Sequence, residues 1–235
     1  MTELKPGDPH YQAYVGPPEQ YDFLGATQFR LLCTLGLRAT HQVLDFGCGS
    51  LRAGRLIMSY LDPGCYYGIE PNAWLIDEAV SRQLGEDFIR LKAPSFDHND
   101  RFDTDVFGCQ FDFIVAQSIF SHTGPDLVRA GLGSFAAALK PGGLIAATFI
   151  HGEEDCDGDG WFYAGQPNNR RVTYRPGTVE AFAREAGLYA RAIPWYHPRQ
   201  NWYLMALDEG RLPTEAMLRH LSGAVLFDPA FTASL

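Results

Sequence analysis

The chain has 235 residues, 46% of them hydrophobic and 20% charged, and its formal net charge is −9. This length and composition predict one globular domain, and the negative charge argues against a nucleic-acid-binding surface, which is usually basic. The first residues lack the apolar core of a signal peptide, no apolar run reaches the roughly 20 residues that span a bilayer, and the scattered cysteines form no CxxC pair. We therefore expect a cytoplasmic monomer or homodimer with no nucleic-acid or membrane partner.

Two kinds of apolar pattern alternate along the chain. Short continuous apolar runs predict buried strands, and apolar residues spaced three or four positions apart predict helices. Helical segments are also expected on both sides of this alternation, within residues 9–38 and 211–235. In chain order, strands are predicted at 42–46, 65–70, 87–92, 111–118, 142–150, 189–196 and 201–208, with helices at 52–61, 72–84, 125–140 and 178–187.

The order of these elements predicts the fold class. Continuous apolar strands that alternate with helices are typical of a parallel sheet with helices on both faces. The last two strands are joined by only "HPRQ", which is too short for a parallel crossover, so they must be antiparallel neighbours. We expect one α/β domain over 1–235 with a Rossmann-like, seven-stranded, mostly parallel sheet. Its predicted parts are a helical lid over 1–40, a core over 41–208 with a substrate-side loop at 151–177, and a C-terminal helix and tail over 209–235.

The loop after the first predicted strand, "VLDFGCGSLRAG", contains Gly47 and Gly49. Glycines let the backbone turn tightly and approach a ligand closely, and the N-terminus of the following helix suits a carboxylate or phosphate. A dinucleotide fingerprint needs a third glycine where this chain has Arg52, which disfavours a nicotinamide dehydrogenase. Asp45 would repel a pyrophosphate but can bind an ammonium group. Glu70, at the end of the second strand, can accept ribose hydroxyls. A ligand with all these features is S-adenosylmethionine.

Four segments carry a family resemblance. "VLDFGCGS" with the downstream "GIEPN" resembles the first two motifs of class I S-adenosylmethionine-dependent methyltransferases, and "FDFIVAQSIFSH" and "LKPGGLIAATF" are similar to their fourth- and fifth-strand motifs. "GCGSLRAGRL" joined to "YYGIEPN" resembles in particular a bacterial subgroup that acts on small molecules. The resemblance covers residues 40–208 and implies the strand order 3-2-1-4-5-7-6. Leu51 departs from the family pattern, because many members have a third glycine there.

The resemblance also implies which residues bind the cofactor. Asp45 and the glycine loop would border the methionine end, Glu70 would bind the ribose, and the loop after the third predicted strand would flank the adenine. Gln117 and Ser118 would lie near the reactive methyl group. The expected cofactor set is Tyr14, Asp45, Gly47, Cys48, Gly49, Ser50, Leu51, Arg52, Glu70, Pro71, Asn72, Pro94, Ser95, Phe96, Gln117 and Ser118.

The methyl acceptor is expected at the same edge of the sheet. His122 follows the fourth strand and is the leading candidate for a general base, since histidine titrates near neutral pH. His151, after the fifth strand, is a second catalytic candidate. Aromatic and basic residues of two later loops predict a partly apolar substrate with an acidic group. The expected substrate-binding residues are Trp161, Tyr163, Trp195, His197 and Arg199.

These features predict methyl transfer to an oxygen or nitrogen of a small molecule, in bacterial secondary metabolism or glycan biosynthesis. The alternative is a cyclase or a non-transferring binding protein of the same fold that also holds S-adenosylmethionine. Residues 155–166, "DCDGDGWFYAGQ", partly match an EF-hand calcium loop, but Gln166 stands where a bidentate glutamate is needed. We therefore expect no metal site.

Overall fold

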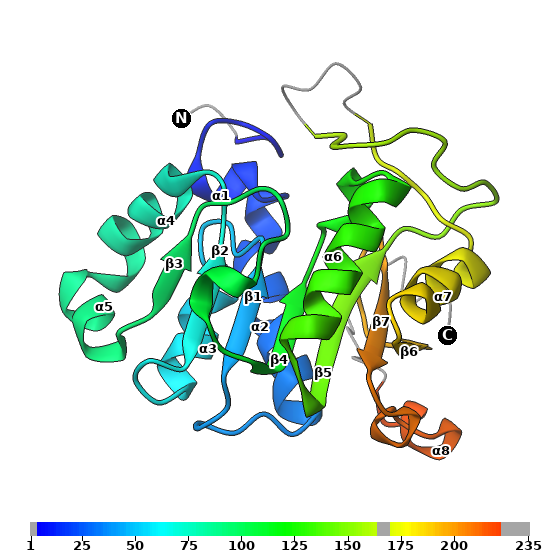
Figure 1. Ribbon diagram of the computed structural model, residues 1–235. Helices are drawn as coiled ribbons and strands as arrows, with labels where there is room; N and C mark the ends of the chain where they lie inside the picture. The colour runs from blue at the N-terminus through cyan, green and yellow to red at the C-terminus, as the bar shows by residue number, and fades with distance from the viewer. Residues whose placement is uncertain (1–3, 164–169, 222–235) are drawn as a thin grey trace.

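The computed structural model describes residues 4–163 and 170–221. Its strands form one seven-stranded sheet in the order β3-β2-β1-β4-β5-β7-β6, as predicted (Figure 1). Within this sheet β7 is antiparallel to both of its neighbours, β5 and β6, and the other neighbouring strands are parallel to each other. The strands are β1 (Val43–Phe46), β2 (Tyr66–Ile69), β3 (Ser95–Asp97), β4 (Phe111–Ala116), β5 (Leu139–Phe149), β6 (Tyr189–Ile193) and β7 (Asn201–Ala206).

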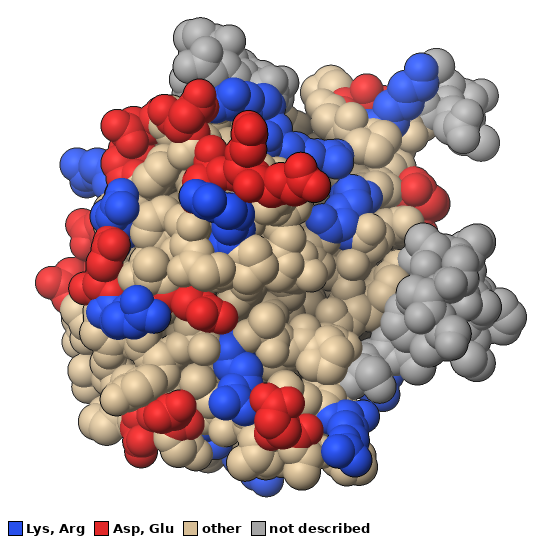
Figure 2. All heavy atoms as spheres, turned by 90° about the vertical axis from the view of Figure 1, so that its right-hand side faces the viewer, with Lys and Arg blue, Asp and Glu red and all other residues tan. Residues whose placement is uncertain are grey.

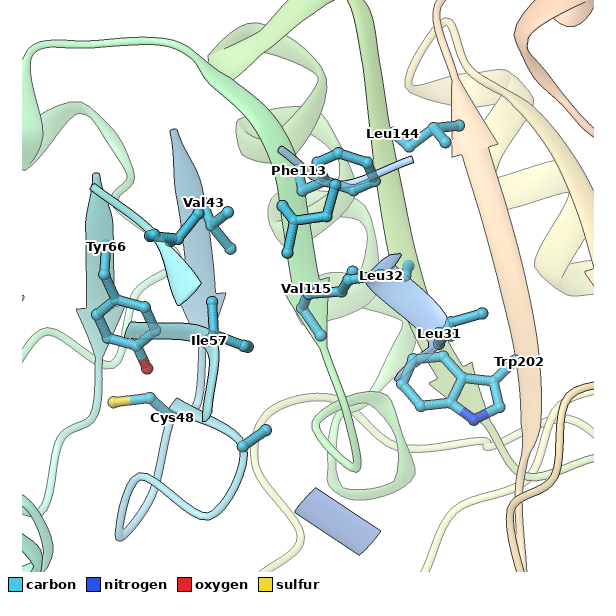
Figure 3. Packing of buried hydrophobic residues seen from close by; sticks show 14 of the residues in the cluster. Leu31, Leu32, Val43, Cys48, Ile57, Tyr66, Phe113, Val115, Leu144 and Trp202 are labelled. Atoms are coloured by element: carbon cyan, nitrogen blue, oxygen red, sulfur yellow. The ribbon is translucent and has the colours of Figure 1, made fainter. Parts of the chain in front are cut away.

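Helices cover both faces of the sheet and create two separate cores. Alternate residues of a strand point to opposite faces, so Val43 and Leu44 of β1 belong to different apolar clusters. The first cluster joins α2, α3 and α4 to the sheet (Figure 3), and the second joins α6 and α7. The helices are α1 (Tyr11–Tyr14), α2 (Tyr21–Thr34), α3 (Gly54–Tyr60), α4 (Ala73–Ala79), α5 (Glu86–Lys92), α6 (Pro125–Ala138), α7 (Pro176–Glu185) and α8 (Glu215–Leu218).

The predicted strand at 87–92 is wrong, because these residues form α5. Acidic residues begin this helix and basic residues end it, which matches the helix dipole. Ala93 ends α5 in the left-handed conformation, and Pro94 follows, where a helix does not continue. The third strand is instead the short β3, so Pro94, Ser95 and Phe96 lie at the start of a strand and not in the loop after it.

The carboxyl ends of the parallel strands meet at the upper edge of the sheet in Figure 1. The N-terminal segment and the connection that follows β5 also lie at this edge. Ligands of open α/β sheets bind at such an edge, so the fold gathers these loops around one position.

Within the described ranges, no helix is long and apolar enough to cross a membrane. Parts of the predicted substrate-side loop (164–169) and C-terminal tail (222–235) lie outside the described residues.

Candidate active site

A cavity of about 570 Å³ opens at the carboxyl edge of the sheet. This volume lies within the range of roughly 300–1,000 Å³ that is usual for small-molecule sites. The ends of β1, β2 and β4 and the loop after β3 form its floor, and the N-terminal segment and the loops at 170–171 and 199–200 form its walls. The cavity therefore lies at the position predicted from the glycine loop.

The loop between β1 and α3 turns at its two glycines. Gly47 and Gly49 have φ angles of 72° and 54°, in the left-handed region that favours glycine. A Cβ atom at Gly47 would overlap Cδ1 of Ile119, and one at Gly49 would lie 2.7 Å from Cγ1 of Val15. The loop is tied to β2, because the N–H groups of residues 47 and 48 both donate to the Ile69 carbonyl. Its shape therefore requires glycine at both positions.

Leu51 takes the place of the third glycine and adopts φ 56°, also in the left-handed region. Its side chain is fully buried in the first apolar cluster. Ser50 is buried as well, and its carbonyl accepts a hydrogen bond from the Tyr21 hydroxyl at 2.7 Å. Neither residue lines the cavity. The departure from the family pattern is thus accommodated by packing, which offsets the backbone strain of a left-handed leucine.

Glu70 follows β2 and places a buried carboxylate at the cavity. One oxygen, Oε2, accepts from the Gly49 N–H at 3.1 Å. The other, Oε1, accepts from the backbone and side-chain N–H groups of Asn72, at 2.9 and 2.8 Å. Burial raises the pKa of Glu70, while these hydrogen bonds oppose the rise. The carboxylate is held in one orientation and keeps lone pairs for a ligand.

Asp45, in β1, is the second buried carboxylate at the cavity. Its Oδ2 accepts a hydrogen bond from the Tyr66 hydroxyl at 2.9 Å. Burial raises the pKa of Asp45 to about 6, although Tyr66 and the charge of Arg52 oppose this rise. A cationic ligand group would stabilise the ionised form of Asp45.

Arg52 links the glycine loop to the N-terminal segment. Its guanidinium donates to the Val15 carbonyl at 2.9 Å, and burial lowers its pKa to about 10. Tyr14 lines the cavity beside it, and burial and the charge of Glu70 raise the pKa of the Tyr14 hydroxyl. The N-terminal segment therefore contacts the loop that would hold a ligand.

Residues after β4 form the other side of the cavity. Ser118 adopts φ 64°; its N–H donates to Thr148 Oγ1 at 2.7 Å, and its hydroxyl accepts from Gln200 Nε2 at 2.8 Å. Gln117 Oε1 and His122 Nδ1 are buried, and neither has a hydrogen-bond partner among the described residues. Burial lowers the pKa of His122, as does the charge of Arg171. The imidazole is therefore neutral at pH 7 and able to accept a proton.

The structure brings most of the predicted site residues together. Those that line the cavity are Tyr14, Asp45, Gly47, Cys48, Gly49, Arg52, Glu70, Pro71, Asn72, Gln117, Ser118, His122, Trp161, Tyr163 and Arg199. Those that do not line it are Ser50, Leu51, Pro94, Ser95, Phe96, His151, Trp195 and His197.

Three predicted residues of the acceptor side contact other parts of the fold. His151 Nε2 lies 2.7 Å from the Tyr203 hydroxyl. Trp195 is buried and donates to the Thr27 carbonyl at 3.2 Å. Burial lowers the pKa of His197 to about 3, and nearby arginines lower it too. These side chains lie at the predicted edge of the sheet but away from the cavity.

Several cavity residues were missed by the sequence analysis. Asn99 and Asp100 lie in the loop after β3, and a correct assignment of that strand would have indicated them. Gln28 of α2, Arg171 and Gln200 reach the cavity from segments whose positions depend on tertiary packing. No local pattern in the sequence marks these three residues.

The acidic segment that partly matches a calcium loop is held by arginines. The Asp155 carboxylate accepts hydrogen bonds from Arg175 and from the Thr178 hydroxyl, and Asp157 pairs with Arg170 at 2.6 Å. The charges of these two carboxylates are therefore balanced within the protein.

Comparison with known proteins agrees with this geometry. A family model described as a methyltransferase domain matches residues 44–145. Residues 44–145 therefore match a methyltransferase domain, and the strand order is the one implied by the resemblance to class I S-adenosylmethionine-dependent methyltransferases. No curated protein matches this sequence. The cofactor of such a domain is S-adenosylmethionine. The glycine loop and the buried carboxylates of Asp45 and Glu70 fit its amino-acid and ribose groups.

Solved structures with the same fold are distant in sequence. DesVI of Streptomyces venezuelae is 17% identical to this chain, with a TM-score of 0.62 and coverage of 88% of this chain and 100% of that chain. The CcbJ methyltransferase of Streptomyces caelestis is 14% identical, with a TM-score of 0.60 and coverage of 82% and 91%. Magnesium protoporphyrin IX methyltransferase of Synechocystis, solved with bound SAH (S-adenosylhomocysteine), is 13% identical, with a TM-score of 0.58 and coverage of 81% and 87%.

Proposed function

We propose that the protein transfers the methyl group of S-adenosylmethionine to an oxygen or nitrogen of a small molecule held in the same cavity. The observation that carries this proposal is the fixed carboxylate of Glu70, which lies hydrogen-bonded to Gly49 of the glycine loop. The acceptor class is supported by Synechocystis magnesium protoporphyrin IX methyltransferase, which has the same fold. The pathway, bacterial secondary metabolism or glycan biosynthesis, stays a prediction of the sequence resemblance.

Each part of the cofactor would meet a different part of the cavity. Glu70 would accept the ribose hydroxyls with its free lone pairs, and Asp45 would bind the ammonium group of the methionine end. The loop with Asn99 and Asp100 is the candidate for the adenine side, because it follows β3 and lines the cavity. The N-terminal segment would act as a lid, since Val15 already contacts Arg52.

When bound, the cofactor supplies an electrophilic methyl group. The main task of the chain is then to align the acceptor atom with that group and to exclude water. We assign proton removal from the acceptor to His122, whose half-buried ring lines the cavity and whose lowered pKa keeps it neutral at pH 7. His151 has no part in this proposal, because its ring contacts Tyr203 outside the cavity.

Isothermal titration calorimetry with SAH tests the cofactor site. We expect micromolar binding by the wild-type protein and an affinity loss of about 1–3 kcal/mol in Glu70→Ala, because the ribose hydroxyls lose a charged acceptor. Glu78→Ala, which removes a partly exposed carboxylate of α4 outside the cavity, is the matched control and should bind normally. Unchanged affinity in Glu70→Ala would contradict the assigned site.

The same titration separates the role of His122 from that of the cofactor site. His122→Gln should bind SAH like the wild type, while methyl transfer should slow about 100-fold if the imidazole is the base. A loss of turnover below threefold would remove His122 from the mechanism.

A further inference from the structure

Arginines from three distant segments line the cavity of this acidic protein. Arg52 follows the glycine loop, Arg171 belongs to the segment that returns toward α7, and Arg199 lies in the connection between β6 and β7. In Figure 2, Lys and Arg side chains are mixed with acidic ones over the whole of this face of the molecule, its upper end included. The cavity therefore contains several positive charges although the net charge of the chain is −9.

Arg171 and Arg199 differ from their neighbours in having no acidic partner at bonding distance. Arg170 pairs with Asp157 and Arg175 pairs with Asp155, but neither Arg171 nor Arg199 forms an ion pair within the described part of the chain. Burial lowers the pKa of Arg199, and the charge of Arg171 lowers it further, with Glu19 opposing this effect more weakly. Two arginines thus line one cavity, and neither has a carboxylate at bonding distance among the described residues.

The backbones of both arginines are fixed beside the acceptor end of the cavity. The Val172 N–H donates to the Ser121 carbonyl at 3.0 Å, which holds Arg171 next to the 3₁₀ turn that carries His122. Gln200 donates to the Ser118 hydroxyl at 2.8 Å, which holds Arg199 next to the end of β4. In the sheet order, these anchors lie on the opposite side of β1 from Glu70. The two cations therefore belong to the acceptor side and not to the ribose side.

We propose that the methyl acceptor is an anion, a small molecule whose carboxylate or phosphate group is bound by Arg171 and Arg199. This inference rests on the proposed function, because it concerns the second ligand of the same cavity. A guanidinium presents paired N–H donors that match the oxygens of carboxylates and phosphates. Such a group would relieve the repulsion between the two arginines, and its binding would hold the acceptor atom close to His122. Trp161 and Tyr163 line the cavity as well and suit an apolar portion of the same molecule.

Anion binding is measured on the intact protein saturated with SAH. Benzoate and benzamide form a matched pair of probes that differ mainly in charge, and inorganic phosphate serves as a second anion. We expect benzoate and phosphate to bind and benzamide to bind at least about tenfold more weakly, as the loss of a charge-assisted hydrogen bond implies. Arg171→Gln and Arg199→Gln should each weaken anion binding by a similar factor. Arg184→Gln, an exposed arginine of α7 outside the cavity, is the matched control and should have no effect.

Three outcomes would overturn the proposal. Equal binding of benzamide and benzoate would show that charge is not recognised, and wild-type anion binding in both cavity variants would place the anion elsewhere. Anion binding that SAH abolishes would assign the arginines to the cofactor carboxylate. The titration is also run without SAH, so failure of SAH to bind contradicts the proposed function alone, and failure of the anions to bind contradicts this inference alone.

Discussion

Asp45 has a buried carboxylate whose protonation depends on what lies beside it. Its pKa of about 6 in the free protein is above the ordinary value of 3.8 because burial disfavours the charged form. A folded-state pKa that is raised above the unfolded one contributes stability below the unfolded pKa, and this contribution is lost as the pH rises through about 6. The ammonium group of a bound cofactor would favour the ionised form and offset this loss.

This balance predicts a pH-dependent affinity for SAH. Between about pH 5 and pH 7 the affinity should rise, because at the higher pH Asp45 is already ionised before the ligand binds. The charges of SAH itself are constant in this range. Calorimetry at several pH values measures the slope. Asp45→Asn keeps an oxygen for Tyr66 but cannot ionise, so its affinity should be lower and its pH profile flatter. If the SAH affinity of Asp45→Asn changed with pH as steeply as that of the wild type, a group other than Asp45 would be responsible for the pH dependence.

At the scale of single elements, the glycine loop is the segment with the least freedom. Gly47→Ala should destabilise the fold for two reasons, the left-handed φ of 72° and the overlap of a new Cβ with Ile119. Gly108 has a similar φ of 61° but open space around it, so Gly108→Ala measures the free-energy cost of the left-handed backbone alone. We expect a loss of about 1–2 kcal/mol in Gly108→Ala and a further 1–3 kcal/mol in Gly47→Ala, measured by urea unfolding. Equal losses would mean that the loop moves aside without strain.

The elements also show how far the sequence predicts the structure. The glycine loop, the long strands and the final antiparallel pair were predictable, because their apolar runs and short connection leave few alternatives. α5 was mistaken for a strand because Phe88, Ile89 and Leu91 form an apolar group, yet none of them is buried. The charges at its ends, Glu86 and Asp87 first and Arg90 and Lys92 last, were the signal that identifies a helix.

Side-chain direction explains most of the misplaced site residues. Topology placed His151, Trp195 and His197 at the correct edge, but which side of that edge each one faces depends on the local backbone and on packing. Arg171 and Gln200 were missed for the converse reason, since their positions depend on hydrogen bonds to Ser121 and Ser118 from distant segments. Such long-range contacts leave no periodic trace in the sequence.

For the molecule as a whole, the sheet predicts an uneven distribution of local stability. The central strands β1 and β4 are buried and paired on both sides, whereas β3 and β6 lie at the edges, and Tyr189 of β6 is half exposed. Amide hydrogen exchange followed by mass spectrometry should therefore be slowest in β1 and β4 and fastest in β3 and β6. Addition of SAH should slow exchange in the glycine loop and in residues 4–16 if the N-terminal segment closes as a lid. Unchanged exchange there would contradict the lid.

The walls of the acceptor side come from connections whose buried residues also belong to the apolar cores, with Val172 and Tyr174 in the second cluster and Trp195 in the first. Arg171 and Arg199 are exposed residues of such connections, so replacing them removes little packing. Mutation can therefore explore new acceptors in this chain while the sheet and the cofactor loop keep their sequence. The same division within each connection gives protein engineers a practical route, in which the exposed cavity residues are varied and the buried residues that support the cores are kept.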